Sequence, residues 1–217
     1  MIPLGMMNAG RPLTVLCLGA HADDIEIGAG GTLLQWFEHG VDLSVHWCVL
    51  SSNGTRAAEA QASAADFLEA ATDRSVSIAS FDDGFFPQQG REIKEWLLEV
   101  RQRVTPDVIF THRASDAHQD HRVVQELTWN IFRDHVVLEY EVPKWDGDFG
   151  KPNLYVPLAA QCVDRKIALL RKHFGTQRSK DWFDDETFRG LARLRGVECR
   201  APERYAEAFV ARKLRLG

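Results

Sequence analysis

The chain has 217 residues, of which 45% are hydrophobic and 26% charged. These values are typical of a globular protein, and the length predicts one domain with a sizeable core. The net charge of −5 at pH 7 and the lack of any basic tract exclude a general nucleic-acid-binding surface.

Apolar runs of strand length alternate with segments of helical periodicity along most of the chain. Strands are predicted over residues 13–20, 41–50, 76–81, 108–110, 136–142 and 205–210. Helices are predicted after Thr32, over 57–71, around 93–100, after His121, and around 167–170 and 188–194. This alternation predicts an α/β fold, in which helices cover both faces of a mostly parallel sheet. We expect a flexible leader over residues 1–12 and a single domain over 13–217.

A cluster of polar side chains, His21-Ala22-Asp23-Asp24, directly follows the first predicted strand. His21 and Asp24 are three residues apart, so in a tight turn both can point to one side and hold one metal ion. Asp23 then points elsewhere and is free to take a proton from an attacking water, which suits hydrolysis. The alternative is a pair of helix-capping aspartates beside a solvent-exposed histidine.

A second polar stretch, Asp116 to His121, follows the predicted strand 108–110 and offers the third ligand that a metal site needs. By itself it could equally be a polar loop that caps the next helix. Because ligands bind at the carboxyl ends of strands in open parallel sheets, we expect the two stretches to meet in one site.

The glycines after the first motif could indicate a dinucleotide-binding loop. The third position of such a motif is Leu33 here, and the acidic cluster would repel a pyrophosphate, so this interpretation fails. Gly28, Gly30 and Gly31 are instead expected to allow close backbone approach.

The order and spacing of His-Ala-Asp-Asp, Gly-Ala-Gly-Gly-Thr and a distant His-Gln-Asp-His resemble the PIG-L/LmbE-like family of zinc N-deacetylases. The usual first motif of that family has a proline, a turn stiffener rather than a ligand, where Ala22 stands. The resemblance extends over almost the whole chain, including Arg56, 106–108 and 205–209. It implies a Rossmann-like fold and removal of an acetyl group from an N-acetylglucosamine-type amino sugar.

The expected metal ligands are His21, Asp24 and His121. Zinc is the expected ion, with Fe²⁺ or Co²⁺ as alternatives. Asp23 is the expected general base, which later delivers its proton to the leaving amine. We expect Asp120 to orient His118, so that His118 stabilises the oxyanion as an imidazolium.

The weaker expectations concern substrate contacts. Arg56 is a candidate substrate-binding residue, and Asp83 a weaker one. Residues 143–157 are rich in proline, glycine and aromatic residues and predict a long loop near the pocket. Trp145 in this loop either stacks on a sugar ring or packs inward.

The remaining features concern the setting of the protein. Four cysteines without metal-type spacing predict a reducing, cytoplasmic environment. No apolar run approaches the roughly 18 residues of a membrane span, and the run before His21 lacks the cleavage pattern of a signal peptide. We expect a small-molecule amino sugar as partner, neither nucleic acid nor membrane, and leave a homo-oligomer open.

Two other functions stay open. The same metal chemistry could cleave another amide, such as that of a thiol-sugar conjugate. The chain could also be a catalytically idle sugar- or metal-binding module, although such a module is expected to lose its base first and Asp23 is present.

Overall fold

The computed structural model describes residues 11–215, so most of the expected leader lies outside the described residues. The strands are β1 (Leu13–His21), β2 (Leu43–Ser51), β3 (Asp73–Ile78), β4 (Val108–His112), β5 (Val136–Tyr140), β6 (Leu154–Leu158) and β7 (Tyr205–Ala211). The α-helices are α1 (Asp24–Glu38), α2 (Gly54–Phe67), α3 (Gly90–Arg103), α4 (Gln119–Ile131), α5 (Ala160–His173) and α6 (Asp185–Cys199). Two short 3-10 helices are η1 (Phe86–Gln88) and η2 (Gly175–Gln177).

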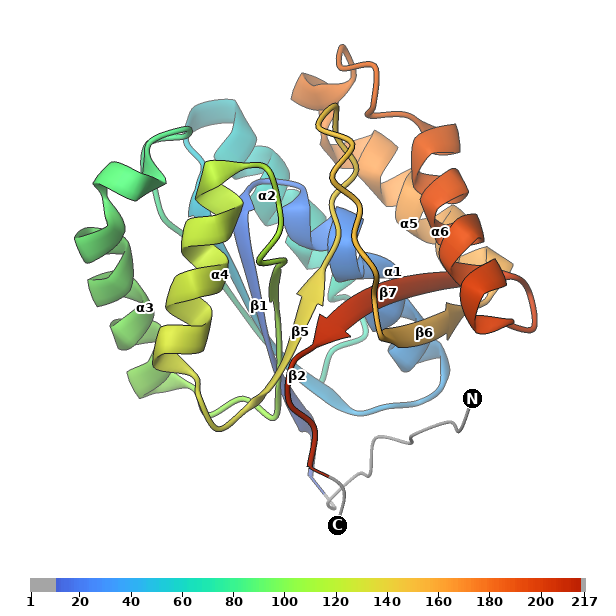
Figure 1. Cartoon of the computed structure of the whole chain (residues 1–217), viewed down its shortest axis with the longest axis horizontal. Coiled ribbons are helices and arrows are strands. Elements are labelled where there is room, and N and C mark those ends of the chain that lie inside the picture. Colours follow the sequence, from blue (N-terminus) through green and yellow to red (C-terminus); the bar gives the residue numbers. More distant parts are fainter. Residues whose placement is uncertain (1–10, 216–217) are drawn as a thin grey trace.

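The strands form one sheet in the order β3-β2-β1-β4-β5-β7-β6 (Figure 1). Strands β1 to β5 are parallel, and β7 runs antiparallel to both of its neighbours. From β1 the chain moves outward through β2 and β3 and then returns to place β4 on the other side of β1. Ligands bind outside the carboxyl ends of the strands at such a reversal of strand order, and both polar motifs lie there.

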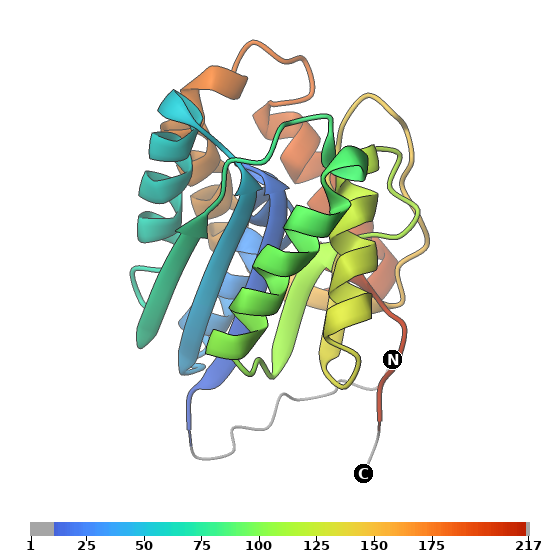
Figure 2. The same ribbon diagram turned by 90° about the vertical axis from the view of Figure 1, so that its left-hand side faces the viewer.

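Helices cover both faces of the sheet, as Figure 2 shows with α3 and α4 in front of it. Successive residues of β1 point to opposite faces. Leu16 and Leu18 belong to the core under α3 and α4, whereas Val15 and Cys17 belong to the core under α1, α2 and α5. The expected α/β fold with a mostly parallel sheet is confirmed.

Helix α1 begins inside the first motif, at Asp24, and not after Thr32 as expected. Its glycines allow neighbouring side chains to approach the helix closely. A Cβ atom at Gly28 would lie 2.2 Å from a ring carbon of Tyr140, and one at Gly30 would lie 2.7 Å from Phe67. The expected close approach is therefore confirmed at these glycines.

The expected loop over 143–157 is too long, because β6 begins at Leu154 and pairs with β7. β6 lies at the edge of the sheet, where a proline such as Pro157 is tolerated because its missing N–H is not needed by a second neighbour. Among residues 11–215, no helix is long and apolar enough to cross a membrane.

Candidate metal and catalytic site

The first motif forms the turn from β1 into α1. His21 is the last residue of β1, and Asp24 is the first residue of α1. Between them Asp23 has a φ of 98°, in the left-handed region that a non-glycine residue seldom adopts. The backbone N–H of His21 donates to Asp24 Oδ2 at 2.7 Å, so the turn itself fixes the Asp24 carboxylate beside the His21 ring.

The three expected metal ligands come together in the structure. His121 Nε2 lies 3.3 Å from His21 Nδ1. Asp24 places one carboxylate oxygen 3.5 Å from His21 Nδ1 and the other 3.5 Å from His121 Nε2. A tetrahedral ion with ligands at 2.0–2.1 Å separates its ligand atoms by about 3.3–3.4 Å. One donor atom from each of these three buried residues lies within 4.8 Å of the other two, which is compatible with a single shared metal ion.

A carboxylate lies beside the second ring nitrogen of each ligand histidine, the one that does not face the other ligands. Asp116 Oδ2 lies 3.1 Å from His121 Nδ1, and Asp120 Oδ2 lies 3.2 Å from His21 Nε2. Metal-binding histidines typically pair their second ring nitrogen with a carboxylate in this way. Both carboxylates are fully buried or nearly so, and Asp120 also accepts from the backbone N–H groups of Gly84 and Phe86.

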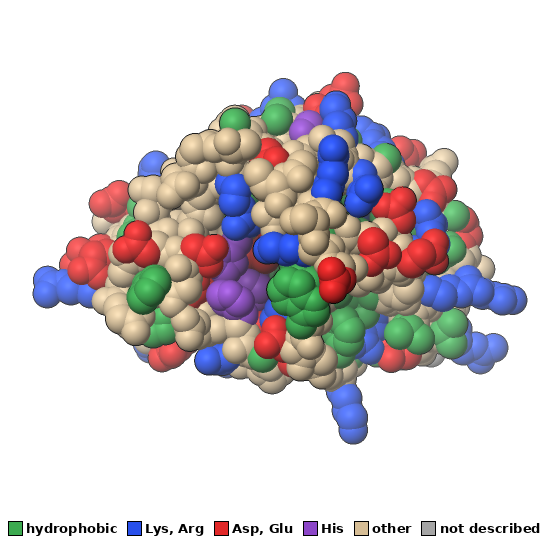
Figure 3. All heavy atoms as spheres, turned by 90° about the horizontal axis from the view of Figure 1, so that it is seen from above, with side chains coloured by type: hydrophobic (Ala, Val, Ile, Leu, Met, Phe, Trp, Pro, Cys, Tyr) green, Lys and Arg blue, Asp and Glu red, His purple; other side chains and the backbone are tan. Residues whose placement is uncertain are grey.

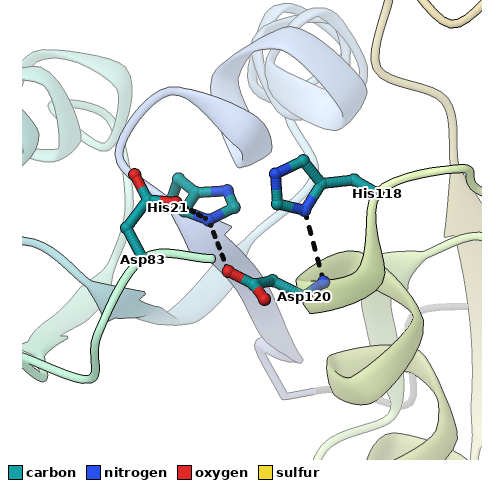
Figure 4. Close-up of side chains that lie close together, drawn as sticks. All are labelled: His21, Asp83, His118 and Asp120. Carbon is teal, nitrogen blue, oxygen red and sulfur yellow. Dashed lines mark hydrogen bonds and ion pairs between the residues drawn. The ribbon is translucent and has the colours of Figure 1, made fainter. Parts of the chain in front are cut away.

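His118 is oriented differently from our expectation. The backbone N–H of Asp120, and not its carboxylate, contacts the His118 ring, with 3.2 Å between the nitrogen and Nδ1 (Figure 4). Because Nδ1 accepts this hydrogen bond, the ring proton resides on Nε2. Burial and the nearby His21 also lower the pKa of His118. Both observations describe a neutral imidazole rather than the expected imidazolium.

Asp23 lies beside the ligands with an unshared carboxylate oxygen. The residue is buried, and among residues 11–215 its Oδ2 has no hydrogen-bond partner. Burial and the neighbouring Asp24 raise the pKa of Asp23 well above its ordinary value, against the opposing influence of Arg56. Asp24 shows the opposite balance, because His121 and His112 outweigh its burial and lower its pKa. The two adjacent aspartates thus have different proton affinities.

Arg56 and Asp83 lie at the rim of the same site. Arg56 donates to the carbonyl oxygen of Ala22 at 3.0 Å and places guanidinium nitrogens 3.6 Å from Asp23 and 3.7 Å from Asp83. Asp83 also reaches His21 Nε2 at 3.1 Å (Figure 4). The structure therefore brings every candidate residue of the sequence analysis to one place.

Sequence reasoning missed His112, the last residue of β4. Its buried ring stacks on that of His121 at 3.8 Å between centroids, and its Nε2 lies 3.2 Å from Asp24 Oδ2. The signal that could have identified it is its place at a strand end, beside the second motif. It also missed the roles of Asp116 and of Lys144, whose Nζ lies 3.0 Å from Asp116 Oδ1.

The site opens to the surface through a cleft of about 170 Å³. Figure 3 looks onto the carboxyl ends of the parallel strands and shows histidines at the floor of a hollow, bordered by acidic, basic and hydrophobic side chains. The cleft is lined by the motif residues together with residues 144–146, Gln177, Lys180 and Trp182. A small molecule can therefore reach the cluster.

The chain matches a known protein family over the segment that contains both motifs. Residues 16–132, just over half of the chain, match the family described as PIG-L, GlcNAc-PI de-N-acetylase. The chain belongs to this family. The match contains both motifs, Arg56 and Asp83, and it ends before residues 142–146 and 177–182, from which the rest of the cleft lining comes.

Several known proteins resemble this PIG-L family member over most of its length. YaiS of Escherichia coli, described as an uncharacterized deacetylase, is 23% identical over 175 residues, covering 77% of this chain and 94% of its own. The N,N'-diacetylchitobiose deacetylase of Pyrococcus horikoshii has a TM-score of 0.69 at 20% identity, covering 91% of this chain and 83% of its own.

A third relative has a different activity. GalB of Pseudomonas putida, a 4-carboxy-2-hydroxymuconate hydratase, has a TM-score of 0.74 at 20% identity and covers 94% of this chain and 98% of its own. At such identities the structural likeness establishes the shared fold of this PIG-L family member. A shared fold does not determine an activity, which depends on the residues of the site.

Proposed function

We propose that this chain is a zinc-dependent N-deacetylase that removes the acetyl group from an N-acetylglucosamine-type amino sugar. The observation that carries the proposal is the donor spacing of His21, Asp24 and His121 beside the buried carboxylate of Asp23. Membership of the PIG-L family supports the reaction and the amino-sugar class.

The donor set fits zinc. Two imidazoles and one carboxylate are a common protein ligand set for a catalytic zinc ion, and the three donors here are close enough to share one ion. Fe²⁺ and Co²⁺ accept the same donors. When bound, such an ion lowers the pKa of water to about 7 and polarises an amide carbonyl.

Asp23 is the proposed general base. It is the one carboxylate of the first motif that the two ligand histidines do not contact, and among residues 11–215 its Oδ2 has no hydrogen-bond partner, so this oxygen is free to accept a proton. It removes a proton from the attacking water and returns it to the leaving amine. The guanidinium of Arg56, 3.6 Å away, keeps the carboxylate in place.

His118 is the proposed oxyanion donor, as a neutral ring. The Asp120 N–H at Nδ1 leaves the proton on Nε2, from which it can be donated to the negative oxygen of the tetrahedral intermediate. His118 therefore keeps the expected role of stabilising the oxyanion, but as a neutral imidazole and not as the expected imidazolium. Arg56 and Asp83, which line the cleft opening, are the proposed contacts for substrate hydroxyl groups.

The test is release of free acetate from N-acetylglucosamine and its glycosidic, nucleotide-linked and inositol-linked derivatives. Zinc-loaded protein is compared with chelator-treated protein, and we expect release that the chelator abolishes. Release of a larger acid from other amides would favour the thiol-sugar amidase. Metal binding without any product would favour the catalytically idle binding module. Addition of water to an unsaturated acid would instead indicate a hydratase activity like that of GalB.

We also propose a cytoplasmic setting. All four cysteines are free in the structure, which supports a reducing compartment because oxidising ones favour disulfides. Detection of a disulfide in protein isolated from its source cells would contradict this proposal.

A further inference from the structure

Helix α6 leaves one of its faces uncovered on the outside of the molecule (Figure 1). The opposite face packs on β7 and α5, and its residues Phe188, Ala192 and Gly196 are buried. Leu194 and Val197 lie on the uncovered face and are 63% and 58% exposed. They are three residues apart, so their side chains are neighbours on one side of the helix. Contiguous exposed apolar surface, unlike singly scattered apolar side chains, marks an interaction site.

The apolar surface continues beside α6 on the segment that leads into β6. Arg195 Nη2 donates to the carbonyl oxygen of Gly150 at 3.2 Å, and the Tyr155 hydroxyl donates to Glu198 Oε2 at 3.2 Å. These hydrogen bonds hold the segment against α6, so Phe149, which is 46% exposed, lies next to the helix. Figure 3 shows hydrophobic side chains gathered on the right of the molecule, where α6 lies.

Charges of opposite sign lie at the two ends of the uncovered face. Glu186 in the first turn of α6 is exposed, and so is Arg200, which directly follows the last residue of the helix. The ion pairs that α6 makes within residues 11–215 use other side chains and leave both of these unpaired. Each lies seven residues from position 193, so the two charges are symmetric about the middle of the face.

A two-fold axis through the middle of this face would pair these charges. In a symmetric dimer the same patch of both copies meets, so that residue i contacts residue j and residue j contacts residue i. Two antiparallel α6 helices would place Glu186 of each copy beside Arg200 of the other, with the apolar side chains between the two ion pairs. A parallel pair would place like charges side by side. The helix dipoles also favour the antiparallel pair, because each N-terminus lies beside a C-terminus.

We propose that α6 is a dimerisation surface, which binds α6 of a second copy of this chain in antiparallel orientation. Leu194 and Val197 of both copies form its apolar centre, and the pairs of Glu186 with Arg200 flank it. A helix of 15 residues is about 22 Å long, so the contact is small and the expected Kd is on the order of micromolar. The dimer does not depend on the proposed reaction.

The first test is sedimentation velocity of the full chain. The wild-type protein is expected to sediment as a dimer at about 100 μM and to dissociate towards the monomer near about 1 μM. Leu194→Glu puts a charge into the apolar centre, and this variant should be a monomer at both concentrations. The matched control Leu98→Glu changes an exposed leucine of α3 and should dimerise as the wild type does. Circular dichroism checks that both variants are folded.

An exchange of charges tests the orientation of the two helices. Glu186→Arg brings two arginines together at each end of the interface, and Arg200→Glu brings two glutamates together. Each single variant should raise the Kd of the dimer roughly 10-fold, because two attractions become two repulsions. The double variant Glu186→Arg/Arg200→Glu restores opposite charges at both ends and should dimerise with nearly the wild-type Kd.

A wild-type protein that is still a monomer at about 100 μM would overturn the proposal. A dimer that Leu194→Glu leaves intact would overturn it as well. Single charge reversals without effect on the Kd, or a double variant that dimerises no better than the single ones, would refute the antiparallel arrangement.

Discussion

Replacing Gly28 by alanine tests how α1 is packed under the first motif. The added Cβ would lie 2.2 Å from Tyr140 Cδ2 and 2.9 Å from Tyr140 Cβ, so turning the ring does not relieve the clash. Tyr140 cannot simply move away, because it is fully buried and its hydroxyl donates to the carbonyl oxygen of Leu18 at 2.7 Å. Overpacking of this kind costs about 1–3 kcal/mol, and the rigid setting favours the upper end.

The expected loss is smaller than the clash alone, because alanine favours a helix over glycine by about 1 kcal/mol. We therefore expect Gly28→Ala to lower the free energy of unfolding by about 2 kcal/mol, or the melting temperature by roughly 4–8 °C. Gly190 is the matched control, since it also lies inside a helix but a Cβ there meets nothing within 4 Å. Gly190→Ala should raise stability by about 1 kcal/mol.

Both variants are measured by urea unfolding followed by circular dichroism, with the slopes compared to confirm that the same surface is exposed. The reasoning is refuted if Gly28→Ala is as stable as Gly190→Ala. A Gly28→Ala protein of wild-type stability with Tyr140 unmoved would refute it equally.

Three further substitutions test the site. His121→Ala should abolish stoichiometric zinc binding in equilibrium dialysis, and full retention of the ion would remove His121 from the ligand set. Asp23→Ala should bind zinc normally while turnover falls about 10²- to 10⁴-fold, and wild-type turnover in the zinc-loaded variant would exclude Asp23 as the base. Asp116→Asn should weaken zinc binding about 10- to 100-fold, because His121 Nδ1 loses its carboxylate partner. An unchanged zinc affinity would show that this contact does not orient the ligand.

The fold was predictable where a local pattern is sufficient. The inner strands β1, β4 and β5 appear as apolar runs because both of their faces are buried, and turn residues such as Gly84, with a φ of 82°, mark the ends of the elements. The start of α1 was hidden because the segment from Asp24 to Gly31 is rich in glycine. Its helical form depends on distant contacts, among them Glu207, which accepts the N–H groups of Gly31 and Thr32.

Parts of the candidate site were likewise predictable from the sequence, and others were not. The grouping of His21, Asp24 and His121 was predictable, because the two motifs follow neighbouring strands, β1 and β4, and the sheet brings the carboxyl ends of those strands together. The contact of the Asp120 carboxylate with His21 instead of His118 was not predictable, because it depends on side-chain rotamers. The place of residues 144–146 near the cleft was expected from the composition of the loop, whereas Gln177, Lys180 and Trp182 carry no motif and reach the cleft only in the folded chain.

We propose that one ion, held by His21, Asp24 and His121, is required for amide hydrolysis. The most direct test is a zinc titration of chelator-treated protein, with bound metal and acetate release from the best substrate measured on the same samples. We predict that acetate release rises in proportion to bound zinc and stops rising at one ion per chain. Acetate release that is already complete before zinc is added would contradict the claim, as would zinc binding at one ion per chain that leaves the rate unchanged.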